Sequence, residues 1–344
     1  MERRMGIVDK VLRVREDRRR YVARAFKVWT LARFALSFGA AAALLAGCGG
    51  SHPPIGVPGA MSQGRVVASH ADRSGSWILT EAKREDLLYI SDWRAGNVYI
   101  YSYPAGKMVG TLTGFALPSG LCVDKAGDVW VTSQENGDII EFPHGGTVSI
   151  GMLRDSGLGM DCAIDPVTGN LAATSLEGGV WIWQGARGSP VLYQPPHLVQ
   201  PYYCSYDDVG NLYVDGFPGL RGYRVGLDEL AKGSSSFFTI TLPFKIDGPG
   251  GVQWDGQYLA VSNSGHHVYR YTIAGSVAEL SGVVHLKNAG FLQQFWIERS
   301  TIIGPSRDDG EFLFWKYPVG GEPIKTFSGL AQPDGAAVSL AQEE

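Results

Sequence analysis

The segment Pro118–Thr132 reads Pro-Ser-Gly-Leu-Cys-Val-Asp-Lys-Ala-Gly-Asp-Val-Trp-Val-Thr, and its pattern returns along the chain. Recognisable copies begin at Gly159, Pro201 and Pro249, and weaker ones at Leu87 and Gln293. Each strong copy has an apolar run, an Asp, a turn containing Gly or Asn, and a second apolar run. The middles of the second runs are 41, 42, 41, 47 and 42 residues apart: Tyr89, Trp130, Ala172, Tyr213, Ala260 and Ile302. A fixed period of this length indicates a repeat architecture.

Each repeat predicts β-strands, because short runs rich in Val, Tyr and Trp flank Asp, Gly and Asn turns. A third strand follows in five units: Asn97–Tyr101, Asp138–Phe142, Val180–Trp183, Val268–Tyr271 and Phe312–Trp315. We expect a short helical turn at Gly226–Gly233 and no long helix. Four strands in a unit of 40–50 residues are typical of a β-propeller, whereas a sandwich has no reason to repeat at a fixed period. The sequence therefore predicts an all-β, six-bladed β-propeller with four-stranded antiparallel blades.

The ends of the repeat array suggest how the ring closes. The first unit lacks the apolar run before Leu87, and Trp77–Thr80 is a poor substitute. The last residues, Gln332–Leu340, have the pattern of that missing strand with nothing after it. Pairing the two removes two open sheet edges. We therefore expect the C-terminal strand to complete the first blade.

Charge is unevenly distributed along the 344 residues. The chain has 30 Lys and Arg against 34 Asp and Glu, a net charge of −4. Residues 1–33 carry +7, so the remainder carries −11. An acidic body argues against nucleic acid as a partner, since phosphate binding needs a basic surface.

The N-terminal region has the layout of an export signal. The basic stretch is followed by fourteen apolar or small residues, 34–47, and then Cys48. This segment is short for a membrane span, although a single-pass signal anchor is the alternative. The sequence Leu45-Ala-Gly-Cys48 resembles the lipobox of bacterial lipoproteins. That resemblance implies cleavage before Cys48 and acylation of its thiol, which anchors the protein in membrane lipid. The Arg18-Arg-Arg20 run leaves open export by a twin-arginine route.

These features divide the chain into three parts. We expect residues 1–47 to be a cleaved signal peptide, 48–76 the lipidated Cys with a flexible Gly-, Ser- and Pro-rich linker, and 77–344 the β-propeller. Gly49 follows the cysteine where retention at the inner membrane would need Asp. The resemblance thus implies an exported protein in the cell envelope, with the outer membrane or cell surface favoured.

The repeats also suggest a family. The segment Tyr89-Ile-Ser-Asp-Trp-Arg-Ala-Gly-Asn-Val98 resembles an NHL repeat, and the whole array is similar to NHL-type and SMP-30-like six-bladed propellers. The enzymes of the SMP-30 group hold one divalent cation with Glu, Asn and Asp oxygens on the propeller axis. This resemblance implies one candidate function, a metal-dependent lactonase or lyase with a site in the central channel.

The residues expected at the channel only partly fit such an enzyme. The position five residues before the turn Asp begins the innermost strand, and the six residues there are Ser119, Met160, Tyr202, Gly250, Gln293 and Asp334, with Asp161 as a neighbour of Met160. That set offers few carboxylates, and no histidine recurs at an inner position. We assign no catalytic residue and expect neither metal nor cofactor. The leading hypothesis is a binding or scaffold module for an unknown protein or small molecule at the propeller face.

Two further residue groups have mainly structural interpretations. Four aspartates recur at the first hairpin turn, where an Asp side chain accepts bonds from its own backbone: Asp124, Asp165, Asp207 and Asp255. Cys122, Cys162 and Cys204 lie on three successive inner strands. If a disulfide forms, the strand registers favour Cys122–Cys162, and three buried thiols are the alternative.

Overall fold

The structure is a computed structural model that describes residues 66–67, 75–155, 157–219 and 224–342. The expected signal peptide, Cys48 and most of the expected linker lie outside the described residues. The chain divides into two units, residues 1–64 and 65–344. In the part that is described, no helix has the length and apolar character needed to cross a membrane.

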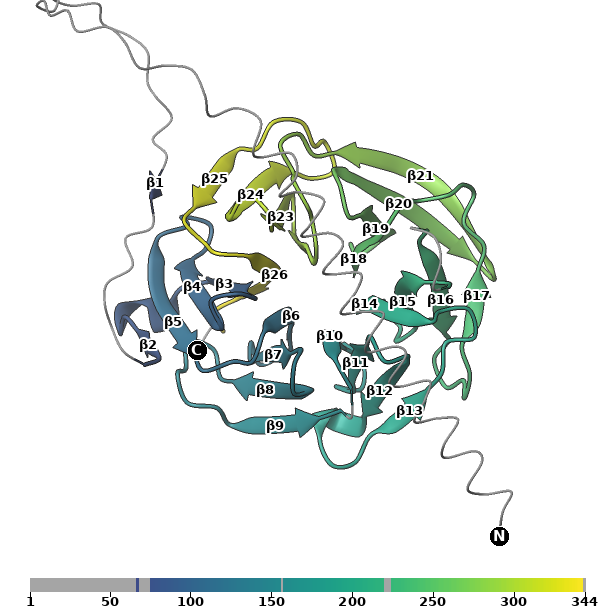
Figure 1. The fold of residues 1–344 in the computed structure, drawn as a ribbon, viewed down its shortest axis with the longest axis horizontal. Helices are drawn as coiled ribbons and strands as arrows, with labels where there is room; N and C mark the ends of the chain where they lie inside the picture. The colour runs from purple at the N-terminus through teal and green to yellow at the C-terminus, as the bar shows by residue number, and fades with distance from the viewer. Residues whose placement is uncertain (1–65, 68–74, 156, 220–223, 343–344) are drawn as a thin grey trace, which may run out of the picture. The chain divides into compact units, whose positions relative to one another are not determined.

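Residues of the second unit form six sheets arranged as blades around one axis (Figure 1), and the strands pair antiparallel except for the two-residue β1 (Val66–Val67). From the axis outward, blade two is β6 (Pro118–Val123), β7 (Val129–Ser133), β8 (Asp138–Phe142) and β9 (Gly151–Arg154), and blade three is β10 (Gly159–Ile164), β11 (Leu171–Ser175), β12 (Gly179–Trp183) and β13 (Val191–Tyr193). In the same order, blade four is β14 (Gln200–Tyr206), β15 (Leu212–Phe217), β16 (Gly226–Leu230) and β17 (Phe238–Ile240), and blade five is β18 (Pro249–Trp254), β19 (Leu259–Asn263), β20 (His267–Ala274) and β21 (Val277–His285). The predicted six-bladed β-propeller is confirmed.

The other two blades each have a fifth strand. Blade one is β26 (Pro333–Ser339), β3 (Leu87–Asp92), β4 (Asn97–Ser102), β5 (Met108–Thr113) and β2 (Trp77–Ile78). Blade six is β22 (Trp296–Glu298), β23 (Thr301–Ser306), β24 (Glu311–Lys316), β25 (Lys325–Ser328) and β1 (Val66–Val67). Two short 3-10 turns, η1 (Glu81–Arg84) and η2 (Gln184–Ala186), lie in connections.

The ring closes as predicted, through the C-terminal strand. β26 pairs antiparallel with β3, and Ala336, Ala337 and Val338 lie opposite Ile90, Tyr89 and Leu88. All seven residues of β26 are buried. The weaker candidate for this position, Trp77–Ile78, instead pairs with β5 at the outer edge of the blade.

Three local expectations need correction or refinement. The helical turn expected at Gly226–Gly233 is wrong, because Gly226–Leu230 forms β16 and pairs with both neighbouring strands. The innermost strand of blade six begins at Trp296, so Gln293 lies in the connection before it. Val66–Val67, within the stretch expected to be a linker, pairs parallel with β25.

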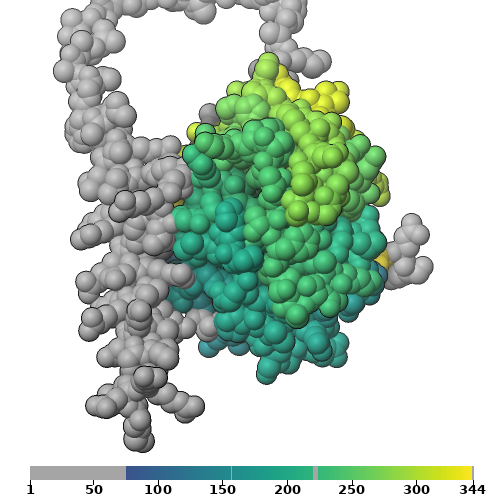
Figure 2. All heavy atoms as spheres, turned by 90° about the vertical axis from the view of Figure 1, so that its right-hand side faces the viewer, coloured from purple at the N-terminus to yellow at the C-terminus, as the bar shows by residue number. Residues whose placement is uncertain are grey.

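Apolar side chains pack between blades, and each interface between adjacent blades has its own cluster. Both faces of an inner strand are therefore covered, which explains the near-continuous apolar runs in the sequence. Between blades six and one, the ring centroid of Phe312 lies 4.7 Å from those of Tyr101 and Phe327. Figure 2 shows the side of the ring that lies at the right of Figure 1, where the green part of the chain, which includes blade five, forms the outer wall.

The four turn aspartates cap their own hairpins as expected. Oδ1 of Asp207 accepts hydrogen bonds from the backbone N–H groups of Val209, Gly210 and Asn211 at 2.8–3.0 Å. Gly210 has φ of +97°, a conformation that glycine adopts without strain. Asp124, Asp165 and Asp255 accept equivalent bonds from residues two ahead of them. The Asp in each repeat is thus part of the turn.

Candidate functional site

The residues expected at the channel lie together at one mouth of the ring. Four of them are the second residue of an innermost strand: Ser119, Met160, Gly250 and Asp334. Tyr202 is the third residue of β14, and Gln293 precedes β22. Ser119, Met160, Gln293 and Asp334 are at most 5% exposed. These four side chains are therefore packed inside the protein.

A chain of contacts crosses this mouth from blade two to blade six. The Ser119 hydroxyl donates to Oδ2 of Asp334 at 2.7 Å, and Nη1 of Arg307 lies 3.0 Å from Oδ1 of the same carboxylate. The Arg307 guanidinium also lies over the Trp93 ring, 4.8 Å from its centroid. Trp93 and Arg307 each follow directly after the second strand of a blade, which places them at the same end as the starts of the inner strands.

The same chain continues into blade three. Nε1 of Trp93 donates to Oε1 of Gln134 at 2.8 Å, and Nε2 of Gln134 lies 2.7 Å from the sulfur of Met160. We call Trp93, Gln134, Met160, Arg307 and Asp334 the channel-mouth cluster. It combines the half-buried side chains of Trp93, Arg307 and Gln134 with the buried side chains of Met160 and Asp334. Sequence reasoning selected only Met160 and Asp334 of these five.

Asp161 takes part in a separate, fully buried network on the axis. Its Oδ1 accepts from Nε2 of Gln294 at 2.7 Å, and its Oδ2 accepts from the backbone N–H of Cys204 at 3.0 Å. Gln294 also exchanges two hydrogen bonds with the backbone of Leu121. Burial raises the pKa of Asp161 well above its usual value, and the Cys204 N–H opposes this shift. Gln294 therefore joins the inner strands of blades two and three and was missed by the repeat alignment, which selected its neighbour Gln293.

Tyr202 and Gln293 make contacts of their own. The ring of Tyr202 meets that of Phe217 edge-on, with 5.2 Å between centroids. The fully buried hydroxyl of Tyr203 donates to Oε1 of Gln293. Four of the six expected residues are thus the second residue of an inner strand, whereas Tyr202 and Gln293 are displaced from that position and make separate contacts.

A ring of hydroxyl groups also surrounds the axis, and sequence reasoning did not find it. Ser91 donates to the carbonyl oxygen of Ser119 at 2.6 Å, and Thr174 donates to that of Tyr202 at 2.5 Å. Thr132 bonds the carbonyl oxygen of Gly120 at 2.9 Å and lies 3.3 Å from that of Met160. The equivalent positions of blades four, five and six hold Asp215, Ser262 and Gly304. Each of the three hydroxyls contacts the inner strand of the next blade, a role that the sequence signals by a polar residue two positions after the aligned strand middle.

Asp215 is the acidic member of this ring. Its Oδ1 accepts the backbone N–H of Tyr203 at 3.0 Å, and the side chain is fully buried. Burial raises the pKa of Asp215 well above its usual value, against the opposing effect of that N–H. A protonated Asp215 carries an O–H group, as the Ser and Thr residues at the equivalent positions do.

The three cysteines take the positions expected from their registers. Cys122 and Cys162 are joined by a disulfide between blades two and three, with 5.6 Å between their Cα atoms. Cys204 is a buried free thiol.

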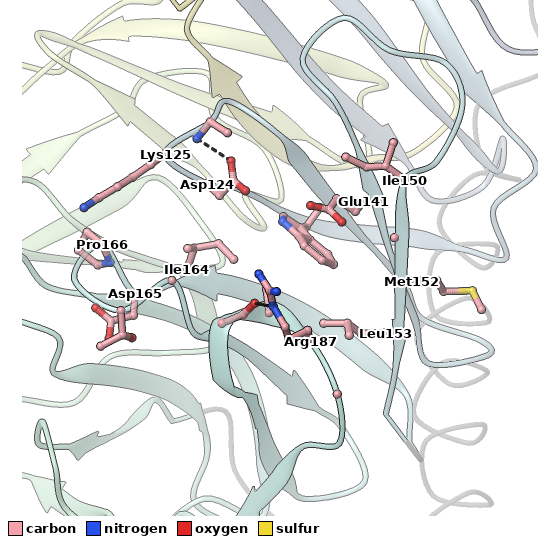
Figure 3. Close-up of a pocket in the computed structure, with 18 of the residues that line it drawn as sticks. Asp124, Lys125, Glu141, Ile150, Met152, Leu153, Ile164, Asp165, Pro166 and Arg187 are labelled. Carbon is pink, nitrogen blue, oxygen red and sulfur yellow. Dashed lines mark hydrogen bonds between the residues drawn. The ribbon is translucent and has the colours of Figure 1, made fainter.

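A pocket of about 770 Å³ lies between blades two and three (Figure 3). Asp124, Glu141 and Arg187 line it together with apolar residues of β9. Carboxylate oxygens of Asp124, Asp128 and Glu141 lie within 4.8 Å of one another. However, Oδ1 of Asp124 already accepts the backbone N–H groups of Ala126 and Asp128 at 2.9 Å. The acidic groups of this pocket are thus partly used as a turn cap.

Comparison with solved structures supports the architecture. A crystal structure of a nidogen–laminin complex matches with a TM-score of 0.62 and 14% identity, over 75% of this chain and 100% of that chain. The Cps50 (Swd1) β-propeller domain of Myceliophteria thermophila matches with a TM-score of 0.50 and 12% identity, over 75% and 88%. A functionally unknown protein from Desulfotomaculum acetoxidans matches with a TM-score of 0.54 and 9% identity, over 75% and 100%. The chain has the β-propeller fold.

Identities this low show the fold alone. No protein-family model and no curated protein matches the sequence. The function of this β-propeller has to be argued from its own surfaces.

Proposed function

We propose that this chain is a lipid-anchored, extracytoplasmic β-propeller that acts as a binding or scaffold module through the channel-mouth cluster. The observation that carries this proposal is the pairing of Trp93 with Arg307 at the end of the propeller where the inner strands begin. Trp, Tyr and Arg are the residue types most enriched at binding hot spots. The ion pair with Asp334 and the hydrogen bond to Gln134 hold both side chains in place, which reduces the entropy lost on binding.

The proposed location at a membrane outside the cytoplasm depends on Cys48, which lies outside the described residues. The lipobox resemblance supports acylation at this thiol, and a disulfide such as Cys122–Cys162 suits an oxidising compartment outside the cytoplasm. Cys48→Ser should abolish labelling by a radiolabelled fatty acid and release the protein from the membrane. Unchanged labelling would show that another residue carries the anchor.

The alternative, an SMP-30-like or lyase-like metal enzyme, has less support. A hard cation needs several free oxygens around one point. At the axis, Asp334 is paired with Arg307, and both oxygens of Asp161 accept hydrogen bonds. Among the described residues, the groups of three metal-ligating side chains within 4.8 Å lie elsewhere. A rise in melting temperature with millimolar Ca²⁺ or Mg²⁺ that Asp334→Asn removes would support the enzyme instead.

The binding role can be tested by screening the full chain in detergent for ligands that raise its melting temperature. The panel should include saccharides and peptides. We expect a stabilising ligand whose effect is lost in Trp93→Ala and in Arg307→Ala.

The matched control is Trp254→Ala. Trp254 is also half-buried, and its Nε1 also donates to a side chain, Oδ2 of Asp208 at 2.8 Å. It lies at the opposite end of an inner strand, away from the mouth. Ligands whose effect survives both mouth variants would place the binding surface elsewhere and refute the proposal.

A further inference from the structure

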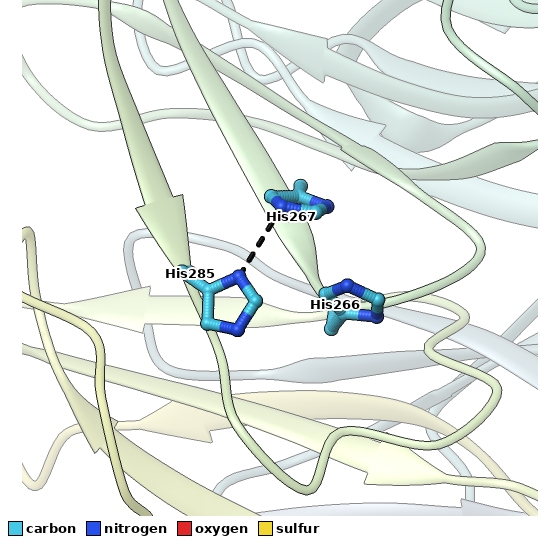
Figure 4. A group of neighbouring side chains, drawn as sticks. All are labelled: His266, His267 and His285. Carbon is cyan, nitrogen blue, oxygen red and sulfur yellow. Dashed lines mark hydrogen bonds between the residues drawn. The ribbon is translucent and has the colours of Figure 1, made fainter.

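Three histidines from the outer half of blade five lie together at the surface (Figure 4). His267 begins β20 and His285 ends β21, and the two face each other across the antiparallel pair. His266 directly precedes β20. Their ring centroids are 4.4–4.9 Å apart, and one nitrogen of each ring lies within 4.8 Å of the others. His266 and His285 are exposed and His267 is half-buried, so the cluster is open to solvent.

The spacing of these nitrogens is close to that of ligands on one metal ion. Nδ1 of His285 lies 3.2 Å from Nε2 of His267. With Zn–N bonds of about 2.0–2.1 Å, two ligands on a tetrahedral ion lie roughly 3.4 Å apart. Imidazole nitrogen suits Zn²⁺ and Cu²⁺, whereas Mg²⁺ and Ca²⁺ prefer oxygen. The third ring, that of His266, is exposed and can turn toward the same point.

The backbone around the cluster is held in place, which limits the cost of assembling a site. The carbonyl oxygen of His266 accepts from Leu286 N–H at 2.8 Å, directly beside His285. The N–H of His267 donates to Oδ1 of Asn263 at 3.0 Å. The carbonyl oxygen of His285 accepts from Gly321 of blade six at 2.8 Å. The three side chains therefore project from fixed points on two paired strands and on the residue just before one of them.

We propose that His266, His267 and His285 bind one divalent transition-metal ion of the Zn²⁺ or Cu²⁺ class on the outer wall of blade five. Three imidazole ligands leave a fourth coordination position open. That position is available to water or to a ligand atom from a partner. This site is separate from the channel mouth and does not depend on the function proposed there.

Zinc titration of the full chain tests the proposal. The protein is purified in detergent without a polyhistidine tag, stripped with a chelator, and titrated with Zn²⁺ by isothermal calorimetry. We expect one site per chain, and no comparable site for Mg²⁺. His267→Ala and His285→Ala should each weaken binding by at least tenfold, since changes even outside the ligand shell cost 10–100-fold. His266→Ala should also weaken it.

Two controls make the result specific. His197→Ala removes an exposed histidine outside the cluster and should bind as the wild type does. A His52→Ala/His70→Ala variant removes the two histidines outside the described residues. Melting temperatures equal to that of the wild type, measured in chelator, establish that the variants are folded. If His285→Ala is not folded, His285→Gln is used in its place. Equal zinc binding by the wild type and by a variant that carries His266→Ala, His267→Ala and His285→Ala together would overturn the proposal. Unchanged binding by His266→Ala alone would overturn the three-ligand site.

Discussion

Ser91 and Ser262 occupy the same position of their repeats, but only the Ser91 hydroxyl has hydrogen-bond partners among the described residues. Comparing the two residues therefore tests whether the ring of hydroxyl groups around the axis connects the blades. Ser91 donates to the carbonyl oxygen of Ser119 at 2.6 Å and accepts the N–H of Gly335 at 2.8 Å. It therefore connects β3 both to the closing strand and to blade two. The buried hydroxyl of Ser262 has no hydrogen-bond partner among the described residues.

The expected energies follow from these contacts. Ser91→Ala leaves two buried backbone groups without partners, and each costs about 1–3 kcal/mol. We expect a loss of about 3 kcal/mol, on the order of 6–12 °C in melting temperature at roughly 2–4 °C per kcal/mol. Ser262→Ala removes a hydroxyl that gains nothing from its buried site. It should leave stability unchanged or raise it by about 1 kcal/mol.

Urea unfolding followed by tryptophan fluorescence measures both variants under one condition, with calorimetry as a second probe. The two substitutions delete the same atom at equivalent positions, so their difference isolates the hydrogen bonds. An equal loss of stability in both variants would contradict the assignment of the ring as a connection between blades. A destabilised Ser262→Ala would mean that its hydroxyl has a partner in solution.

Three further predictions address other parts of the ring. Removing residues 331–344 deletes the buried strand β26 and should lower the free energy of unfolding by several kcal/mol, at about 25 cal/mol per Å² over a few hundred Å². The shortened chain should therefore aggregate or be proteolysed. Cooperative melting at the wild-type temperature would refute the closure. Burial, and then the charge of Asp207, raises the pKa of Glu229 to about 7 from 4.5. The folded state thus keeps a proton that the unfolded chain has released, and stability falls as the pH rises from about 4.5 to 7. Urea midpoints at pH 4.5 and 8 should show that Glu229→Gln reduces this fall and changes little at pH 4.5; an undiminished fall would reject the assignment. The disulfide spans 40 residues of sequence, so reductant should lower wild-type stability by about 4 kcal/mol and leave Cys122→Ser unaffected. A Cys122→Ser variant as sensitive to reductant as the wild type would show that the bond is not the cause.

The repeat made the fold predictable because each unit carries the same local signals. Apolar runs that pack between blades and aspartates that cap hairpins appear directly in the sequence. The third strand of blade four did not, because the buried Asp228 and Glu229 interrupt its apolar pattern. Gln294 was missed for a different reason. The innermost strand of blade six begins only at Trp296, so the residue that reaches the axis is set by the path of a loop.

The site residues were less predictable because their partners come from distant parts of the chain. Trp93 and Arg307 are more than two hundred residues apart, and only ring closure brings them together. His267 and His285 are neighbours through the pairing of β20 with β21, which no periodicity in the sequence indicates. A repeat alignment finds positions that every blade shares. It does not find contacts that only one pair of blades makes.

Ring closure and the channel mouth depend on the same strand. Asp334 is the second residue of β26. Its carboxylate accepts a hydrogen bond from the Ser119 hydroxyl and forms an ion pair with the Arg307 guanidinium. The strand that joins the two ends of the propeller thus also positions the cation that lies over Trp93. If the mouth binds a ligand as proposed, that ligand contacts this assembly only in the closed ring, so its binding free energy adds to the stability of closure. By the same linkage, a variant that weakens β26 pairing without unfolding the ring should bind more weakly at the mouth, although none of its altered atoms touches the ligand.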